Sequence, residues 1–248
     1  MGISTWLNPH FLDGRFYRMI ISNTNKFIFI FIPRTAGESI RRSLESFVET
    51  AANEVVEHIS ANSLRKRLGE KWNEYFTFAI IRNPWSRVVS TYLALKESEN
   101  TKISNLFSNY SFEDFCFFSG FTRGLSSAIP LEQYDQLPAE ISSLFANEFK
   151  NIAVSQKTLI TDENDQIIVN YVAKYEDLKN EFPTIVSYLN LGGEAPPELE
   201  NIAVLDYKEF YTRPLVQLIT SAFMDDIDFF GFSFNSSATK NIGLIRNL

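Results

Sequence analysis

The segment Lys26–Arg42, KFIFIFIPRTAGESIRR, constrains the fold of this chain most strongly, because a hydrophobic strand in it runs directly into a loop and a helix. Residues Phe27 to Ile32 are all β-branched or aromatic, which is typical of a strand buried on both faces of a parallel sheet. Pro33 ends this strand, and an apolar helical pattern begins at Ser39. The small residues at 35–37 would let a ligand approach the backbone.

A strand, loop and helix in this order are suited to holding phosphate. The amides at the helix start point into the loop, the helix dipole favours an anion there, and Arg34 adds a positive charge. The segment lacks the Walker pattern G-x-x-x-x-G-K-[ST], however, and many α/β proteins have a similar connection that binds nothing. On these residues alone, both an anion-binding loop and an ordinary connection stay open.

The segment Phe76–Tyr92, FTFAIIRNPWSRVVSTY, repeats the arrangement. A hydrophobic strand ends at Arg82, and a helix follows in which Pro84 suits the first turn and Asn83 can act as the cap. Arg82 and Ser90 could therefore grip a second phosphate, the first by charge-assisted bonds and the second by its hydroxyl. The alternative is a surface arginine and a helix serine, both of which are common.

Together the two segments resemble the sulfotransferase superfamily. Its loop for the 5′-phosphosulfate, I-P-K-T-A-G-T-S, is matched by IPRTAGES at Ile32–Ser39, and its loop for the 3′-phosphate, R-N/D-P-x-x-R-x-x-S-x-Y, is matched from Arg82 to Tyr92, about 45 residues later. The likeness continues through His58, Gln156 with Thr158–Leu178, and Asp226–Phe234. It is closest to bacterial members of the membrane-type carbohydrate sulfotransferase group.

The resemblance implies an α/β fold, with a central parallel sheet flanked by helices in a P-loop-like sulfotransferase arrangement. It also implies transfer of a sulfuryl group from 3′-phosphoadenosine 5′-phosphosulfate (PAPS) to an acceptor hydroxyl, with adenosine 3′,5′-bisphosphate (PAP) as product and no metal. A carbohydrate or glycoconjugate acceptor is favoured by the resemblance alone. The donor-binding residues implied are Arg34, Thr35, Ala36, Gly37, Glu38, Ser39, Arg82, Ser90 and Tyr175.

His58 is the predicted catalytic base. A lone histidine is more often structural, but the resemblance favours the catalytic role here, since related 2-O-sulfotransferases have their base between the same two loops. It follows Val55-Val56 at the end of a predicted short strand, so it would lie at the edge of the sheet where ligands of open α/β folds bind. A neutral imidazole can take the proton of an attacking alcohol. His10 is the only other histidine and has no motif around it. The resemblance gives Arg34 a catalytic part as well, stabilising the leaving oxygen.

Two residues depart from the family pattern. The usual loop lysine is replaced by Arg34, which is planar rather than a compact ammonium. The usual threonine is replaced by Glu38, whose carboxylate would repel a phosphosulfate unless it turns outward. A binding-only homologue without turnover therefore remains an alternative. A P-loop-like nucleotide kinase is another, although the missing Walker lysine and glycines count against it.

Composition agrees with one compact enzyme. The 248 residues are 45% hydrophobic, enough to bury a large core as a single domain over 1–248, although length alone would also allow two domains. The chain has no apolar run long enough to span a bilayer and no signal pattern at its N-terminus, so we expect a cytoplasmic protein. Cys116 is the only cysteine, which excludes an internal disulfide, and its phenylalanine neighbours predict a core position.

The charge is unevenly distributed. The chain carries a formal net charge of −7, but residues 1–125 hold 15 Lys and Arg against 12 Asp and Glu, whereas residues 126–248 hold 8 against 18. An acidic protein of this kind is a poor candidate for nonspecific nucleic-acid binding. The clusters at 41–42 and 65–67 could steer an anionic substrate toward the site, or could simply be solvated helix faces.

The remaining pattern predicts secondary structure only coarsely. A short strand at Glu54–Glu57 and a helix at Ser60–Tyr75 would lead to the strand from Phe76, giving parallel pairing with the first strand. Further predicted features are a capping box of Ser111 and Asp114, core phenylalanines at 112, 115 and 118, two strands in Gln156–Tyr175 around the turn TDENDQ, a helix at 178–191 capped by Asp177, and a loop at Gly192–Pro197.

Overall fold

A computed structural model describes residues 20–49, 60–98, 101–118, 154–199 and 206–245. The described residues fall into two compact units. The sheet unit lies within Tyr17–Asn83, Ser155–Val204 and Asp228–Leu248, and the helical unit contains the described residues of Pro84–Val154 and Leu205–Ile227. The single domain expected over 1–248 stays a prediction.

Within the described residues the sheet has five strands, which lie side by side in chain order. They are β1 (Ile20–Ser22), β2 (Phe27–Ile30), β3 (Phe76–Ile81), β4 (Tyr171–Lys174) and β5 (Gly243–Leu244). The three central strands are parallel, with Phe29 opposite Phe78 and Phe78 opposite Tyr171. The edge strands β1 and β5 pair antiparallel with their neighbours. The α/β fold with a parallel centre is confirmed, and the antiparallel edges make the whole sheet mixed.

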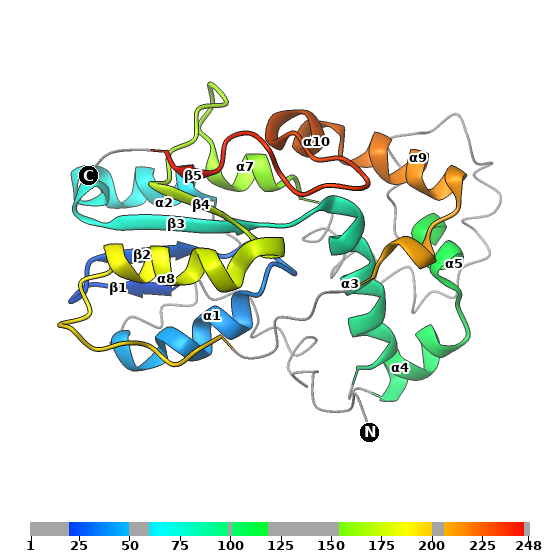
Figure 1. Cartoon of the computed structure of the whole chain (residues 1–248), viewed down its shortest axis with the longest axis horizontal. Coiled ribbons are helices and arrows are strands. Elements are labelled where there is room, and N and C mark those ends of the chain that lie inside the picture. Colours follow the sequence, from blue (N-terminus) through cyan, green and yellow to red (C-terminus); the bar gives the residue numbers. More distant parts are fainter. Residues whose placement is uncertain (1–19, 50–59, 99–100, 119–153, 200–205, 246–248) are drawn as a thin grey trace. The chain divides into compact units, whose positions relative to one another are not determined.

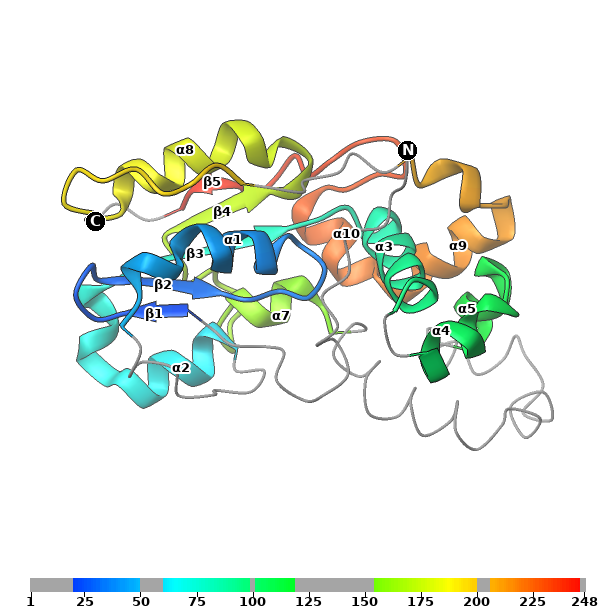
Figure 2. The ribbon, with the colours of Figure 1, turned by 90° about the horizontal axis from the view of Figure 1, so that it is seen from below.

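Helices cover both faces of this sheet (Figures 1 and 2). Helices α1 (Gly37–Leu44) and α8 (Leu178–Tyr188) lie on one face, and α2 (Ala61–Leu68) and α7 (Gln156–Ile160) lie on the other. Short 3₁₀ turns follow or connect these elements at Glu45–Phe47, Gly69–Glu74 and Tyr175–Asp177. Both faces are covered, and accordingly every residue of β2 and β3 is buried and all are hydrophobic except Thr77 of β3, whose hydroxyl bonds to Asn170.

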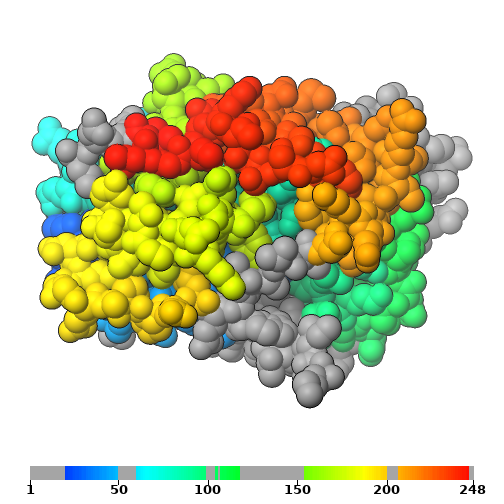
Figure 3. All heavy atoms as spheres, in the orientation of Figure 1, coloured from blue at the N-terminus to red at the C-terminus, as the bar shows by residue number. Residues whose placement is uncertain are grey.

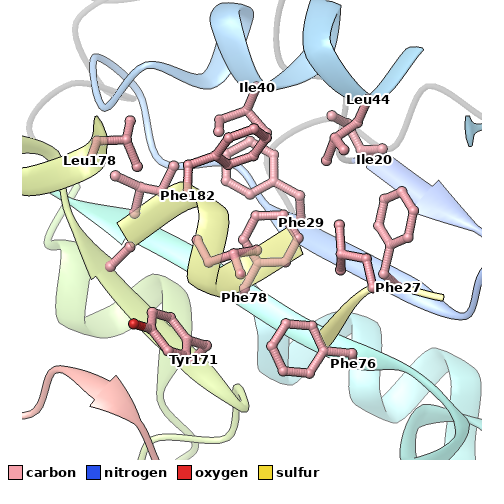
Figure 4. Close-up of a cluster of buried hydrophobic side chains, with 14 of the residues drawn as sticks. Ile20, Phe27, Phe29, Ile40, Leu44, Phe76, Phe78, Tyr171, Leu178 and Phe182 are labelled. Carbon is pink, nitrogen blue, oxygen red and sulfur yellow. The ribbon is translucent and has the colours of Figure 1, made fainter. Parts of the chain in front are cut away.

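Aromatic side chains fill the space between the sheet and the α1–α8 layer (Figure 4). The rings of Phe29 and Phe78 stack across the two strands with centroids 5.1 Å apart, and Ile40 of α1 and Phe182 of α8 pack into the same cluster. Burial of each such side chain contributes roughly 1.5–3 kcal/mol. This layer therefore fixes where α1, and with it the loop before α1, sits on the sheet.

The outer surface on the α8 side is formed by two segments from the second half of the chain. Figure 3 shows α8 with the residues that follow it next to the last described segment, residues 231–245. That last segment ends in β5, which pairs with β4 through Tyr171 opposite Leu244. The last segment thus supplies the edge strand next to β4, and α8 covers one face of the sheet.

The helical unit contains α3 (Pro84–Lys96), α4 (Thr101–Ser108), α5 (Phe112–Phe118), a 3₁₀ turn at Lys208–Phe210 and α9 (Arg213–Ala222), and α10 (Met224–Phe230) begins in it. In this unit the ring of Tyr92 packs against the rings of Phe112 and Phe115, with ring centroids 5.5 Å apart in each pair. The capping box is confirmed, since Ser111 N donates to Asp114 Oδ2 and Asp114 N donates to Ser111 Oγ. Cys116 is buried, as predicted. The side chain of residue 118 lies outside the described residues.

Two local predictions differ from the structure, and a third is not tested by it. The first of the two strands expected in Gln156–Tyr175 is the helix α7, whose first turn is capped by the Ser155 hydroxyl, and only an isolated bridge joins Thr161 to Ile167. The helix expected at 60–75 ends at Leu68, because Gly69 has a positive φ of 57°, and continues as a 3₁₀ turn. The strand expected at Glu54–Glu57 lies outside the described residues.

Candidate functional site

Predicted site residues follow three adjacent parallel strands. The loop with Arg34 follows β2, Arg82 follows β3 directly, and Tyr175 follows β4 directly. Parallel strands bring their carboxyl ends to one edge of a sheet, which is where ligands bind in open α/β folds. The structure therefore brings together most of the donor-binding residues that the sequence predicts.

The loop after β2 has an unusual backbone. Arg34 and Ala36 both adopt left-handed conformations, with φ of 68° and 69°, a state that costs a non-glycine residue about 1–3 kcal/mol and concentrates at ligand sites. The fully buried Thr35 between them donates its hydroxyl to the carbonyl of Ile32 at 2.8 Å. This bond ties the loop to its own start, so the strained backbone is held in one shape.

Gly37 begins α1, two residues before the predicted start, and lies directly under an aromatic ring. A Cβ placed on Gly37 would be 2.0 Å from Cε2 of Phe31. Phe31 itself packs against the core cluster beneath α1. Any larger residue here would force the ring of Phe31 to move, so the constraint on this position comes from the neighbouring ring and not from the φ angle. Ser39 lies in the same first turn of α1 and is partly buried.

Glu38 points along α1 and pairs with two arginines. Its carboxylate accepts from Arg41 Nη2 at 2.8 Å, from Arg41 Nε at 3.0 Å and from Arg42 Nε at 3.1 Å. Burial acts to raise the pKa of Glu38, but the two arginines outweigh it and the pKa lies below its ordinary value. The repulsion expected from a carboxylate at this position is therefore offset within the helix itself.

Arg82 is buried at the end of β3, with 4% of its surface exposed. Its Nη1 donates to the carbonyl of Arg34 at 3.1 Å, and its guanidinium lies 3.9 Å from the centroid of the Tyr175 ring. Burial lowers the pKa of Arg82, against the opposing effect of Tyr175 and Glu176. An arginine stays charged in proteins even so, and a buried cation favours an anionic ligand. Arg82 thus links the two predicted phosphate loops directly.

The backbone around Arg82 is held by side chains from distant segments. Gln156 Oε1 accepts from Arg82 N, and Gln156 Nε2 donates to Arg82 O, both at 2.9 Å. Glu176 accepts from Asn83 N at 2.7 Å. The Asn83 side-chain amide donates to the carbonyls of Ser233 and Ser236 at 2.9 and 3.0 Å. The turn between β3 and α3 is consequently fixed from three sides within the sheet unit.

Ser90 and Arg87 belong to the helical unit. Ser90 is 8% exposed on α3. Arg87 is 1% exposed, donates through Nη1 and Nη2 to the carbonyl of Val154, and lies 4.0 Å from the buried carboxylate of Asp226. The second arginine of the RNPWSR segment therefore organises the helical unit. Sequence reasoning left it without a role, although a charged residue in an otherwise apolar helix is a signal for a buried ion pair.

Several predictions fall elsewhere. His58 and His10 lie outside the described residues, so the predicted base stays a prediction. Of the basic cluster at 65–67, Arg65 lies 3.6 Å from Asp162 and Lys66 pairs with Glu163, which favours a structural over a steering role for these two residues. Among the described residues, no three His, Cys, Asp or Glu side chains gather so that they could hold a metal ion. In the part of the chain that the structure describes, none of the helices has the length and apolar character to span a bilayer.

Comparison with known proteins gives one match. The profile of the sulfotransferase family matches residues 17–233, which is most of the chain and includes both phosphate-loop segments. Comparisons with the curated proteins and with the solved structures find no match.

Proposed function

The chain belongs to the sulfotransferase family, and from that premise we propose that it transfers a sulfuryl group from PAPS to a hydroxyl of a carbohydrate or glycoconjugate. One observation carries the proposal. The buried Arg82 guanidinium bonds to the carbonyl of Arg34 and stacks on Tyr175, so two loops and one aromatic ring converge at the carboxyl edge of the sheet. A nucleotide with phosphates at two positions and an adenine ring needs such a set of partners.

The proposed roles divide between the two loops. Arg34, Ser39 and the amides that open α1 would hold the 5′-phosphosulfate, because a helix N-terminus and a fixed cation both favour an anion. Thr35, Ala36 and Gly37 would shape the loop, and Glu38 would bind the donor through its backbone N–H, because its carboxylate is paired with arginines of the same helix. Arg82 and Ser90 would bind the 3′-phosphate, with the Tyr175 ring stacked on the Arg82 guanidinium.

The chemistry follows from these roles. An acceptor oxygen would form a bond to sulfur while the bond between sulfur and the 5′-phosphate oxygen breaks, and the acceptor proton would pass to His58. Negative charge would collect on the leaving phosphate oxygen, where Arg34 and the loop amides stabilise it. The products would be a sulfate ester and PAP. None of the residues in this scheme requires a metal.

A binding comparison tests the nucleotide site. Replacing Arg82 or Ser90 by alanine should weaken PAP strongly and adenosine 5′-phosphate little, since both residues are assigned to the 3′-phosphate only. Ser86→Ala is the matched control, because Ser86 is a buried serine on the same helix. Equal weakening of both nucleotides in calorimetry would refute the assignment of the 3′-phosphate site.

A transfer assay tests the reaction. The protein is incubated with PAPS labelled in the sulfuryl group and with sugars, a phenol and a lipid alcohol as acceptors. Labelled ester on a sugar supports the proposal, and labelled ester only on another acceptor corrects the acceptor class. Tight PAP binding without transfer to any acceptor would favour a binding-only homologue, and transfer of phosphate in a parallel incubation with labelled ATP would favour a kinase.

A further inference from the structure

We propose that Gln156 is a positioning residue for Arg82, because its buried carboxamide fixes the backbone from which the Arg82 guanidinium reaches the 3′-phosphate. This inference rests on the proposed function, in which Arg82 binds that phosphate. Gln156 has no assigned part in the reaction, and its contact with Arg82 joins residues 74 positions apart in the sequence.

The sheet itself does not hold Arg82. The ladder between β2 and β3 ends at the pair of Ile30 and Ala79, and the ladder between β3 and β4 ends at the pair of Ile81 and Lys174. Arg82 lies beyond both ladders, where its backbone N–H and C=O need partners from outside the strands. A primary amide offers the same donor and acceptor as a peptide group. With bonds of 2.9 Å in each direction, Gln156 takes the place of one residue of a neighbouring strand.

Burial makes the loss of these two hydrogen bonds costly. Gln156 is fully buried and Arg82 is 4% exposed, so water cannot readily replace a lost bond, and a buried polar group left without a partner is costly. Gln156 is held in place by the helix to which it belongs. At the start of α7 the Ser155 hydroxyl accepts from Thr158 N, and at the end of α7 the carbonyl of Ile160 accepts from Ile168 N. Because α7 is held at both ends, the Gln156 carboxamide holds the Arg82 backbone in a fixed position relative to α7.

The guanidinium depends on this backbone. It must meet the Arg34 carbonyl at 3.1 Å and the Tyr175 ring at 3.9 Å at the same time. A guanidinium carries five N–H donors in a fixed fork, so contacts to Arg34 and to a phosphate can coexist only if the fork is held in one orientation. Loss of the Gln156 bonds would let residue 82 shift and would spoil that alignment, while the rest of the nucleotide site stays in place.

Two variants test the inference. Gln156→Glu keeps the shape and the acceptor for Arg82 N but loses the donor to Arg82 O, and Gln156→Met keeps the length but loses both. The control is Gln166→Glu, the same chemical change on an exposed glutamine of the neighbouring turn. For both test variants we expect PAP binding to weaken at least tenfold in calorimetry, with adenosine 5′-phosphate unchanged within twofold. The control should match the wild type.

The pattern across variants separates the possible failures. In an Arg82→Ala background, Gln156→Glu should have no further effect on PAP binding, because the two changes act on one contact. The inference would be overturned if the Gln156 variants bound both nucleotides equally weakly, or if they kept full PAP binding. The proposed function would still stand in either case if Arg82→Ala weakened PAP binding selectively. A wild type without preference for PAP would overturn both. If thermal unfolding shows that the Glu variant does not fold, the Met variant decides, and an unfolded Met variant would make Gln156 purely structural and overturn the inference.

Discussion

Replacing Gly37 by alanine is the change whose effect the structure specifies best. In most helices the substitution stabilises, because glycine is about 0.8–1.0 kcal/mol less favourable than alanine in a helix interior. Here the new methyl group would be 2.0, 2.4 and 2.9 Å from three ring atoms of Phe31. Ordinary contact begins near 3.4 Å, so the ring has to move by more than an ångström.

The displacement of the Phe31 ring determines how much the free energy of unfolding decreases. Overpacking of this kind costs about 1–3 kcal/mol. Phe31 also makes an edge contact with Phe29 at 6.3 Å, and disturbing an aromatic pair costs about 0.5–1.5 kcal/mol more. Against a gain of about 1 kcal/mol from helix propensity, we expect a net loss of about 1–3 kcal/mol in the free energy of unfolding. That corresponds to a decrease in Tm of about 2–4 °C for each kcal/mol.

A double-mutant comparison isolates the cause. Thermal unfolding is measured for the wild type, Gly37→Ala, Phe31→Leu and the double variant. Because leucine lacks the ring atoms that the methyl group meets, the double variant should lose little beyond Phe31→Leu alone, and PAP binding should follow the same order. A Gly37→Ala protein as stable as the wild type would refute the argument that the ring of Phe31 requires glycine at this position.

Three further outcomes are expected. Arg34→Lys should keep donor binding within about tenfold and can raise turnover, and complete loss of binding in calorimetry would mean that Arg34 makes a forked contact that lysine cannot make. Glu38→Gln should lower the free energy of unfolding at pH 7 by a few tenths of a kcal/mol for each lost ion pair, a small value because the carboxylate is 40% exposed. The pKa of Glu38 is lowered on folding, so the difference in the free energy of unfolding between wild type and Glu38→Gln should be complete above about pH 4.5. It should vanish as the pH falls through the folded-state pKa of Glu38. A difference in Tm between the two proteins that persists at pH 2 would contradict this expectation. His58→Ala should reduce turnover by roughly 10²–10⁴-fold with donor affinity nearly unchanged, whereas His10→Ala should have little effect, and normal turnover of the His58 variant would exclude it as the base.

The sequence was sufficient for the central strands and the loops after them. Phe27–Ile30 is hydrophobic at every position and Phe76–Ile81 at every position except Thr77, and such runs are stable only where both faces of a sheet are covered. That pattern predicts parallel pairing, and parallel pairing places the ends of both strands at one edge. The positions of Arg34 and Arg82 therefore follow from the strand pattern, without knowledge of the helices that pack on the sheet.

Short elements were not predictable in the same way. The edge strands Ile20–Ser22 and Gly243–Leu244 are too short to show a period, and their pairing depends on neighbours that are distant in the chain. Residues 156–160, QKTLI, contain Thr, Leu and Ile and have no helical period, so they were predicted as a strand. The available signal was Ser155, whose hydroxyl caps the first turn.

The two departures from the family pattern show what a local motif can and cannot indicate. The spacing of Glu38, Arg41 and Arg42 is i, i+3 and i+4, so the pairing that neutralises the carboxylate can be derived from helix geometry alone. Arg34 is different, because its left-handed backbone and the bond from Arg82 to its carbonyl arise from the fold. Since that bond uses the carbonyl and not the side chain, the backbone at position 34 can join the two loops with either arginine or lysine. In the proposed function, the side chain at that position would serve the leaving group, while its backbone joins the loops.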